Sequence, residues 1–433
     1  MDSRDRTILR LAVPALATLA IEPLYVLVDT AIVGHLGTAP LGGLALASTV
    51  LTTAFFVVTF LEYGVTARVA FLTGAGDRRG AASVATQGLW LSAVFGAGLG
   101  LIVGLGARTL PDALGGSGHV LDAAATYLRI SAVGAPLLIV ALVGNGFLRG
   151  VQDTRTPLVI VAVANVVNVV AEVVLVYGFD LGVAGSAWGT VIAEAVAATW
   201  FAAVMVRHVR STGAGPRPER VELRRLLRMG WHLSVRTGSL LGTLALSTAV
   251  AARLGAASLG GHQIALQIEN LLALLVDGLA IAAQALIGTA LGAGDDQEAR
   301  AVGRRLVTWG VGAGIGLCAV VVGVSHVLPH VFSPDAAVRD RAAVALVLVG
   351  VVQLPAAVVF VLDGVLIGAS DTAYQQWANV AAFVVFCPFA AAVLHWHRLG
   401  IAGLWLGLLA WMIARLAANV ARFAGPRWTR VAA

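Results

Sequence analysis

The sequence predicts an all-α integral membrane protein with twelve transmembrane helices in two six-helix lobes. Apolar residues make up 59% of the 433 residues and charged residues only 12%, whereas a soluble domain carries about 25% charged residues. Apolar runs of about 20 residues, the length that crosses a bilayer, recur along the whole chain. A long-range repeat then divides these runs into two sets.

The repeat has a constant spacing. Gly37 returns as Gly255, the Gly-Ala-Gly-Asp segment at 74–77 returns at 292–295, and Gly150 returns as Gly368. Two residues at this spacing are called counterparts below. Because the spacing persists without a gap, we expect two copies of one structural unit.

The apolar runs give the positions of the individual helices. The alternation of period two that a transmembrane β-barrel requires is absent, so we expect helical spans. In chain order the predicted spans are 8–33, 43–73, 84–108, 124–149, 157–178, 183–208, 229–253, 262–290, 304–328, 342–368, 375–394 and 400–424.

Arginine residues mark the span ends and set the orientation, because cytoplasmic loops carry an excess of positive charge. The richer set, in chain order, is Arg4, Arg6, Arg10, Arg78, Arg79, Arg149, Arg155, the seven arginines of 207–228, Arg300, Arg304, Arg305, Arg422, Arg427 and Arg430. The alternate loops hold fewer: Arg108, Arg129, Arg253, Arg339, Arg341 and Arg398. We therefore expect a multi-pass protein of the plasma membrane with both termini cytoplasmic.

Six spans return the chain to its starting side, so the two halves enter the membrane in the same orientation. Such halves are related by a pseudo-two-fold axis along the membrane normal. We predict lobes at 1–208 and 229–433, joined by a basic cytoplasmic linker at 209–228. The net charge of +6 then belongs to cytoplasmic loops, and no nucleic-acid partner is expected.

Several familiar motifs are excluded. The glycine-rich segments 96–100 and 312–316 follow no strand and lack a phosphate-loop lysine, so they indicate close helix packing rather than nucleotide binding. No carboxylate–histidine cluster indicates a metal site, and no Ser/His/Asp set indicates hydrolysis. We therefore expect neither an enzyme nor a cofactor.

Acidic residues inside spans are costly, and a functional role is the default hypothesis. The candidates are Glu22, Asp29, Glu62, Glu172, Glu194, Glu269, Asp277 and Asp363. Residues of the shared scaffold should recur in the second half, but the counterpart of Asp29 is Ser247 and that of Glu172 is Ala390. These two acids therefore point to chemistry rather than scaffold.

Each of these acids has a polar neighbour one helical turn away. Tyr25 precedes Asp29, and Asn168 precedes Glu172. Residues four apart share a helix face, so each pair can point into one cavity. Two neighbouring carboxyl groups buried away from water can hold and release a proton. The alternative for Asp29 is an internal hydrogen bond that only fixes the first helix.

The chain resembles the multidrug and toxic compound extrusion (MATE) family, and most closely its DinF-like branch, over essentially its whole length. The resemblance rests on Val-Asp-Thr-Ala-Ile-Val-Gly-His-Leu-Gly at 28–37, on His-Gln-Ile-Ala at 262–265, on Leu-Val-Asp-Gly-Leu-Ala-Ile-Ala-Ala at 275–283, and on Leu-Asp-Gly with Ile-Gly-Ala-Ser-Asp-Thr within 362–372.

This resemblance implies two lobes around a central cavity and export of amphiphilic or cationic organic compounds against a proton or sodium gradient. In prokaryotic members the cation site lies in the N-terminal lobe, and its positions fall here on Tyr25, Asp29, Tyr127, Asn145, Asn168, Glu172 and Thr190. Glu172 stands where the family usually has Asp. Another branch has acidic ligands in the seventh span, but 229–253 contains none.

The sequence therefore predicts a monomeric secondary antiporter coupled to protons in preference to sodium. We expect an apolar substrate cavity with sparse polar groups, namely Gln267, Asn270, Asp277, Gln284, Gln353 and Asp363. The alternatives are a sodium-coupled antiporter and a lipid or lipid-linked precursor flippase. A flippase for anionic headgroups should have an arginine-rich cavity, and only Arg68 and Arg236 are intramembrane candidates.

Overall fold

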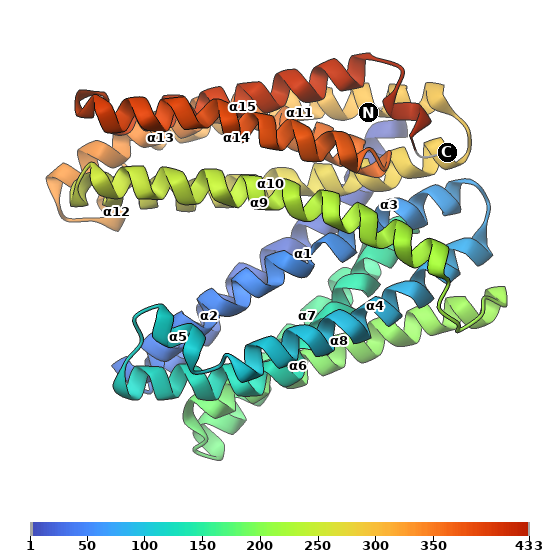
Figure 1. Ribbon diagram of the computed structural model, residues 1–433, viewed down its shortest axis with the longest axis horizontal. Coiled ribbons are helices and arrows are strands. Elements are labelled where there is room, and N and C mark those ends of the chain that lie inside the picture. Colours follow the sequence, from blue (N-terminus) through green and yellow to red (C-terminus); the bar gives the residue numbers. More distant parts are fainter. Residues whose placement is uncertain (1–2, 432–433) are drawn as a thin grey trace. The chain divides into compact units, whose positions relative to one another are not determined.

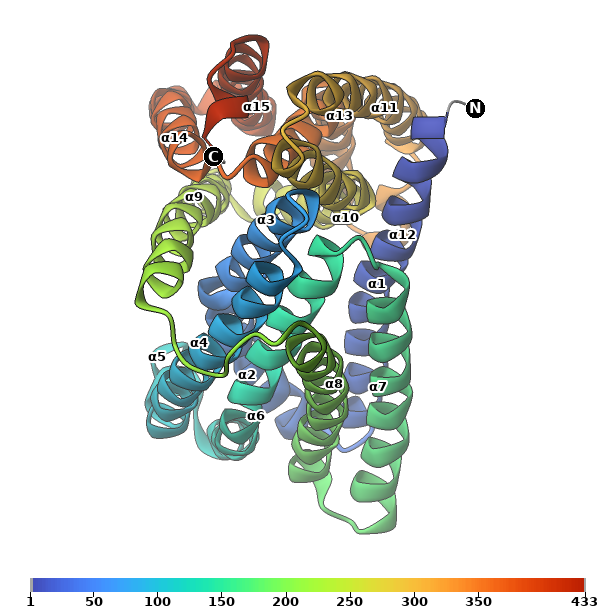
Figure 2. The same cartoon turned by 90° about the vertical axis from the view of Figure 1, so that its right-hand side faces the viewer.

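The computed structural model describes residues 3–431, apart from the side chains of Glu22 and Val57, and these residues form helices and no strand. Twelve of the helical segments are long and apolar enough to span a membrane, which confirms the predicted fold class. Figures 1 and 2 show the helices of each half running side by side.

The first half of the chain runs from α1 to α8. Its elements are α1 (Ser3–Gly34), α2 (Thr38–Val58), α3 (Phe60–Gly74), α4 (Arg78–Leu105), α5 (Thr109–Ala113), α6 (Gly118–Gly150), α7 (Arg155–Val173), the π-helical turn η1 (Val174–Gly178) and α8 (Gly182–Thr212).

The second half repeats this order. Its elements are α9 (Arg220–Arg253), α10 (Ala256–Gly292), α11 (Asp296–Val324), α12 (Pro329–Phe332), α13 (Ala336–Gly368), α14 (Thr372–His395), η2 (His397–Leu399), α15 (Gly400–Ala424) and η3 (Trp428–Arg430). In the first half, Thr59 separates α2 from α3. The corresponding part of the second half is one uninterrupted helix, α10.

Backbone conformation repeats with the sequence. The counterparts Gly76 and Gly294 have φ angles of 73° and 74°, and the counterparts Gly182 and Gly400 have 53° and 54°. These are left-handed conformations, which glycine adopts without a steric penalty. The repeat therefore specifies the turns as well as the helices.

Most helices begin several residues before the predicted spans, and two of these early starts follow a capping aspartate. Asp77 accepts a hydrogen bond from the backbone N–H of Gly80 at 2.7 Å and so caps α4. Asp295 caps α11 in the same way, with Glu298 as donor at 2.8 Å. Capping residues lie outside the apolar run that hydropathy detects, so sequence reasoning placed these helix starts too late.

Residues 13–230 form one compact unit. Helix α6 lies at its centre and packs against α2, α3, α4 and α8, while α7 packs against α8. Glycines permit the close approaches: a Cβ atom at Gly96 would meet the backbone of Pro136, and one at Gly144 would meet Phe201. Within the predicted packing segment 96–100, Gly96 and Gly100 lie against the α6 backbone, and a Cβ atom at Gly98 would have no neighbour within 4 Å.

The residues from Trp231 onward, with those before Val13, form the second compact unit. Helix α13 takes the place that α6 has in the first unit and packs against α10, α11 and α15. A large apolar core gathers there from α9, α10, α11, α13, α14 and α15, including Phe386, Trp405 and Leu408.

The compact units differ in their bounds from the predicted lobes. The start of α1 belongs to the unit of residues 231–433, where Asp5 accepts hydrogen bonds from Arg305 at 2.6 Å and from Trp309 at 3.0 Å. The predicted linker 209–228 lies in the unit of residues 13–230, and only 213–219 of it is non-helical.

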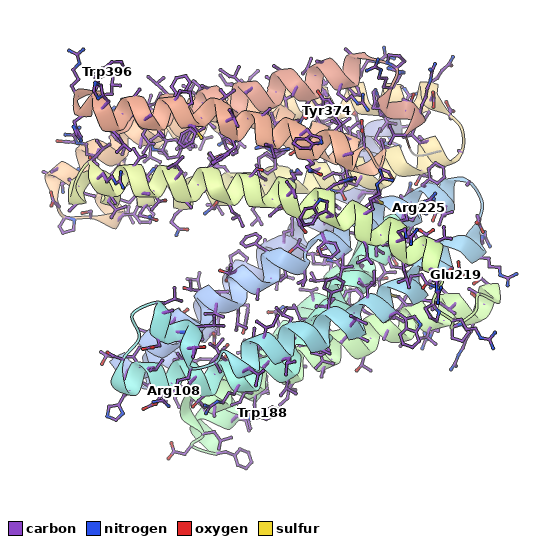
Figure 3. The ribbon with its side chains drawn as sticks, in the orientation of Figure 1. Arg108, Trp188, Glu219, Arg225, Tyr374 and Trp396 are labelled. Atoms are coloured by element: carbon purple, nitrogen blue, oxygen red, sulfur yellow. The ribbon has the colours of Figure 1, made fainter. Side chains whose placement is uncertain are left out.

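The beginning of α9 is held by side chains of its own unit. Arg68 donates to Glu222 at 2.8 Å, and Ser83 donates to Glu219 at 2.8 Å. Figure 3 shows Glu219 and Arg225 at one end of this unit and Arg108 at the other. Glu222 and Glu219 thus hold in place a basic segment that its arginines had predicted to be a linker.

Candidate functional site

The two acids singled out in the sequence lie together in the unit of residues 13–230. Asp29 of α1 is 5% exposed and accepts a hydrogen bond from Ser186 of α8 at 2.6 Å. Glu172 of α7, 1% exposed, lies beside Asp29 and Ser186. Three helices therefore bring two buried carboxyl groups to one point.

The polar neighbours of these acids join the same cluster. The hydroxyl groups of Tyr25 and Thr190 are 2.8 Å apart, and the Asn168 side-chain amide donates to Thr190 at 3.4 Å. Tyr127 of α6 lies beside Thr190 and Ser186. Six predicted cation-site residues are thus close together: Tyr25, Asp29, Tyr127, Asn168, Glu172 and Thr190.

Several oxygen atoms of this cluster are buried without a hydrogen-bond partner. They are both carboxyl oxygens of Glu172 and the side-chain carbonyl oxygen of Asn168. A buried polar atom that makes no hydrogen bond is costly, and each such atom requires an explanation. Three unpartnered oxygens together are acceptors that a bound proton or cation would satisfy.

The backbone next to Glu172 departs from regular α-helix. Helix α7 continues directly into the π-helical turn η1, a distortion that is frequent at functional sites. Gly189 of α8 lies against Glu172, because a Cβ atom there would meet the Glu172 backbone at 3.1 Å. Tyr177 of η1 donates to the carbonyl of Ile32 at 2.9 Å and ties this turn to α1.

The second unit has an apolar core where the first has this cluster. The counterparts of Tyr127, Asn168, Glu172, Ser186 and Thr190 are, in the same order, Ala345, Phe386, Ala390, Leu404 and Leu408. All five belong to the apolar core of that unit. The shared scaffold therefore folds with apolar residues at these five places, whereas the counterparts of Tyr25 and Asp29 are the buried polar residues Thr243 and Ser247. The fold thus does not require the polar residues that α6, α7 and α8 contribute to the cluster.

Asn145 belongs to a different cluster. Its amide donates to Glu62 of α3 at 2.9 Å, and Glu62 also pairs with Arg149 at 2.5 Å. Arg149 is 4% exposed. The family resemblance implied that Asn145 supports the cation site, but its hydrogen bond is to an ion-paired glutamate.

Asp363 of the second unit is ion-paired on two sides. Arg236 and Arg415 donate to it at 2.5 and 2.7 Å, and Asn419 donates to it at 2.8 Å. Gln353, predicted to line the substrate cavity, donates to Glu269 at 2.6 Å. Both predicted cavity residues are thus engaged within their own unit.

The other predicted cavity residues lie on α10 at different depths. Gln267 and Asn270 are exposed, Asp277 is half-buried, and Gln284 is buried. Gly368 of α13 packs against the backbone of Gln284, because a Cβ atom there would meet its carbonyl oxygen at 2.6 Å. Exposed Gln267 and Asn270 are three residues apart and share one face of the helix.

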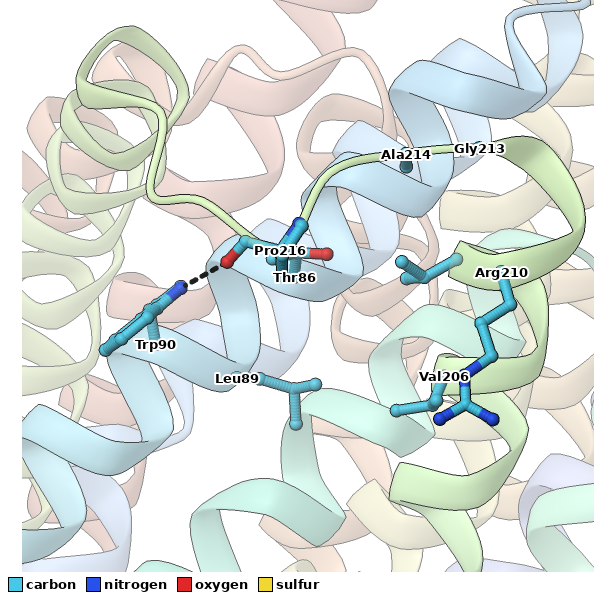
Figure 4. A pocket seen from close by; sticks show the side chains of 9 residues that line it. Thr86, Leu89, Trp90, Val206, Arg210, Gly213, Ala214 and Pro216 are labelled. Atoms are coloured by element: carbon cyan, nitrogen blue, oxygen red, sulfur yellow. Dashed lines mark hydrogen bonds between the residues drawn. The ribbon is translucent and has the colours of Figure 1, made fainter.

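A separate pocket of about 710 Å³ lies in the unit of residues 13–230, between α4, α8 and the segment after α8. Leu89, Val206 and Arg210 line it, and Trp90 donates to the carbonyl of Pro216 at 3.0 Å (Figure 4). None of its lining residues belongs to the acidic cluster.

Among residues 3–431 no group of three or more His, Cys, Asp or Glu side chains has a metal-binding arrangement. Glu22, another acid singled out in the sequence, has its side chain outside the described residues.

Sequence reasoning missed three contributors to these clusters. Ser186 donates to Asp29, and its place four residues before Thr190 on one face of α8 was the available signal. Arg149 and Arg415 are also buried and ion-paired, so the expectation that only Arg68 and Arg236 are intramembrane arginines is wrong. Arg149 was assigned to a loop because it lies at the end of a predicted span, whereas Arg415 lies within the predicted span 400–424 and was overlooked.

Comparison with known proteins agrees with this architecture. The MatE family model matches residues 14–174 and 239–392. Protein DETOXIFICATION 44, chloroplastic, from Arabidopsis thaliana is 33% identical over 428 residues, 96% of this chain and 81% of the relative. DNA damage-inducible protein F from Escherichia coli (strain K12) is 31% identical over 431 residues, 96% of this chain and 91% of the relative.

A solved structure described as MATE in the bent conformation has the same fold. Its TM-score is 0.89 at 22% identity, and the match covers 99% of this chain and 95% of that chain. The family match, the two relatives and the shared twelve-helix fold lead to one conclusion: the chain belongs to the MATE family of membrane transporters.

Proposed function

We propose that the protein is a proton-coupled antiporter that exports amphiphilic or cationic organic compounds by alternating access. The observation that carries this proposal is the buried pair Asp29 and Glu172, in which Glu172 accepts no hydrogen bond. A buried carboxylate without a donor is costly as an anion. A proton, or another cation, is therefore needed when the site is closed to water.

In this proposal a proton enters the cluster from outside and neutralises one carboxyl group. The change alters the packing of α1, which carries Tyr25 and Asp29 and contains Pro14 and Pro23 within a continuous helix. Substrate is released outward in this state. Opening of the site to the cytoplasm then releases the proton. One charge that crosses the membrane supplies about 2.3 kcal/mol per 100 mV.

Sodium coupling is the second candidate, and a specific observation favours it. The three unpartnered oxygens of Asn168 and Glu172 are of the type that hard cations bind. A flippase for anionic headgroups receives less support, because four arginines on α3, α6, α9 and α15 are each paired with a carboxylate within their own unit. They are Arg68, Arg149, Arg236 and Arg415.

The test is export of a fluorescent cationic dye from proteoliposomes under an imposed pH gradient or an imposed sodium gradient. We expect the pH gradient to drive export, and Asp29→Asn to reduce the rate at least about tenfold, since one general-acid/base or charge-carrying group typically contributes this much or more. The matched control is Asp122→Asn, because this carboxyl group is 57% exposed on α6 of the same unit.

Two results would change the conclusion. Export by Asp29→Asn at the wild-type rate would remove Asp29 from the coupling mechanism and the proposal with it. Export driven by the sodium gradient alone would replace proton coupling by sodium coupling at the same cluster.

A further inference from the structure

One intramembrane acid of this unit has no part in the cluster described so far. Glu194 lies on α8, eight residues after Ser186 and four after Thr190. These three residues share one face of the helix. Since an α-helix rises 1.5 Å per residue, Glu194 lies roughly 6 Å beyond Thr190 along the helix axis.

The neighbouring helices place small or polar groups around Glu194. A Cβ atom at Gly134 of α6 would collide with a carboxyl oxygen of Glu194, so the carboxyl group lies against the α6 backbone. Ser131, one turn earlier on α6, has a buried hydroxyl group without a hydrogen-bond partner. The unpartnered polar groups of the cluster thus continue along α6 toward Glu194.

Helix α7 adds a further polar group at this depth. It is antiparallel to α8, with Glu172 against Gly189 and Asn168 against Thr190. Asn165, one turn from Asn168, therefore reaches the level of Glu194, and its amide donates to the carbonyl of Val161 in its own helix at 2.8 Å. Ser131 of α6, Asn165 of α7 and Glu194 of α8 thus lie at similar heights along their helices.

Among the described residues, no cation pairs with Glu194. Helix α8 packs against α2, α4, α6, α7 and η1, and α2 carries no charged residue. Arg149 of α6 pairs with Glu62. The exposed charged or titratable groups of α4, α6, α7 and α8 are Arg78, Arg79, His119, Asp122, Arg129, Arg155, Arg207, His208 and Arg210. The remaining titratable groups of these helices and of η1 are Tyr127, Glu172 and Tyr177, and the described titratable side chains of α1 within this unit are Tyr25 and Asp29.

The internal repeat shows that the scaffold does not need this acid. The counterpart of Glu194 is Met412, and that of Ser131 is Val349. Both lie in the apolar core that also holds the counterparts of Glu172 and Thr190. Glu194 therefore belongs to the set of polar residues by which this unit departs from its apolar copy.

We propose that Glu194 is a second proton-carrying carboxyl group, through which the Asp29–Glu172 cluster exchanges its proton with the cytoplasmic side. The inference rests on the proposed function. Helix α8 runs toward the arginines Arg207 and Arg210, so Glu194 lies on the cytoplasmic side of the cluster. The Glu194 carboxylic acid releases its proton to the cytoplasm, and the carboxylate formed takes up the proton that Glu172 releases. One O–H bond breaks and one forms at each transfer.

The experiment compares two kinds of transport in proteoliposomes with the cationic dye as probe. Net export under a pH gradient requires proton release on the cytoplasmic side, whereas dye-for-dye exchange at equal pH does not. For Glu194→Gln we expect dye exchange within about twofold of wild type and net export at least about tenfold slower, as for loss of a proton-transfer group. Glu194→Asp keeps the carboxyl group and should restore net export. Asp122→Asn is the control.

The outcomes separate this inference from the proposed function. Net export by Glu194→Gln at the wild-type rate and with the wild-type pH profile would overturn the role of Glu194, while loss of export in Asp29→Asn would still support the cluster. If Glu194→Gln does not accumulate, Glu194→Asp decides: a displaced pH profile of export supports the role, and an unchanged profile overturns it.

Discussion

At the scale of single residues, two buried carboxyl groups of this protein have opposite surroundings. Asp363 accepts hydrogen bonds from Arg236, Arg415 and Asn419, whereas Glu172 accepts none. An acid held between two arginines is fixed as an anion and ties helices together. An acid without donors is free to bind a proton or a cation, so the same chemical group serves structure in one unit and, in our proposal, coupling in the other.

The first prediction tests the structural role of Asp363. Replacement by Asn leaves Arg236 and Arg415 without their anion, and loss of one partner of a buried ion pair costs roughly 3–5 kcal/mol. We expect Asp363→Asn to lower the midpoint of thermal unfolding in detergent clearly, and Asp122→Asn, at an exposed ion pair, to leave it nearly unchanged. Equal midpoints for both variants would contradict this role.

At the scale of elements, α4 and its counterpart α11 begin with the same two residue types. Gly76 and Gly294 adopt left-handed backbone, and the following Asp77 and Asp295 cap α4 and α11 through their side chains. The glycine ends one helix and the aspartate begins the next. Two neighbouring residues thus set a tight helix–helix turn in both units.

The second prediction concerns these caps. Asp295→Ala should destabilise the first turn of α11 by about 1 kcal/mol, because the backbone N–H of Glu298 loses its acceptor. Amide hydrogen exchange should become faster there, and Asp77→Ala should have the same effect on α4. Asp296→Ala, at the next residue, is the control and should change exchange less. If Asp295→Ala changed amide exchange at the start of α11 no more than Asp296→Ala does, and Asp77→Ala left exchange at the start of α4 unchanged, the caps would contribute nothing to these turns.

At the scale of the whole molecule, the repeat of equivalent helices fixes how the chain crosses the bilayer. Each half contributes six spans, and the helices of the second half follow those of the first at the constant spacing that relates Gly37 to Gly255. An even number of spans per half gives both halves one orientation. The arginine-rich segments, including 207–228, then predict the cytoplasmic side.

The third prediction tests this orientation. A green fluorescent protein fused after residue 433 should fluoresce and alkaline phosphatase fused there should be inactive, because the first requires a cytoplasmic location and the second an external one. Fusions at Asp180, in the loop between α7 and α8, should give the reverse pattern. The same pattern at both positions would contradict the predicted topology.

The sequence by itself determined the number of spans, the repeat and the faces shared by Tyr25 with Asp29 and by Asn168 with Glu172. These follow from hydropathy and helical periodicity, which act along one stretch of chain. Only the tertiary structure decided which faces meet: Ser186 donates to Asp29, Asn145 turns to Glu62, and Arg415 pairs with Asp363. Periodicity states that a residue faces inward, but the packing of neighbouring helices selects the partner that it finds there.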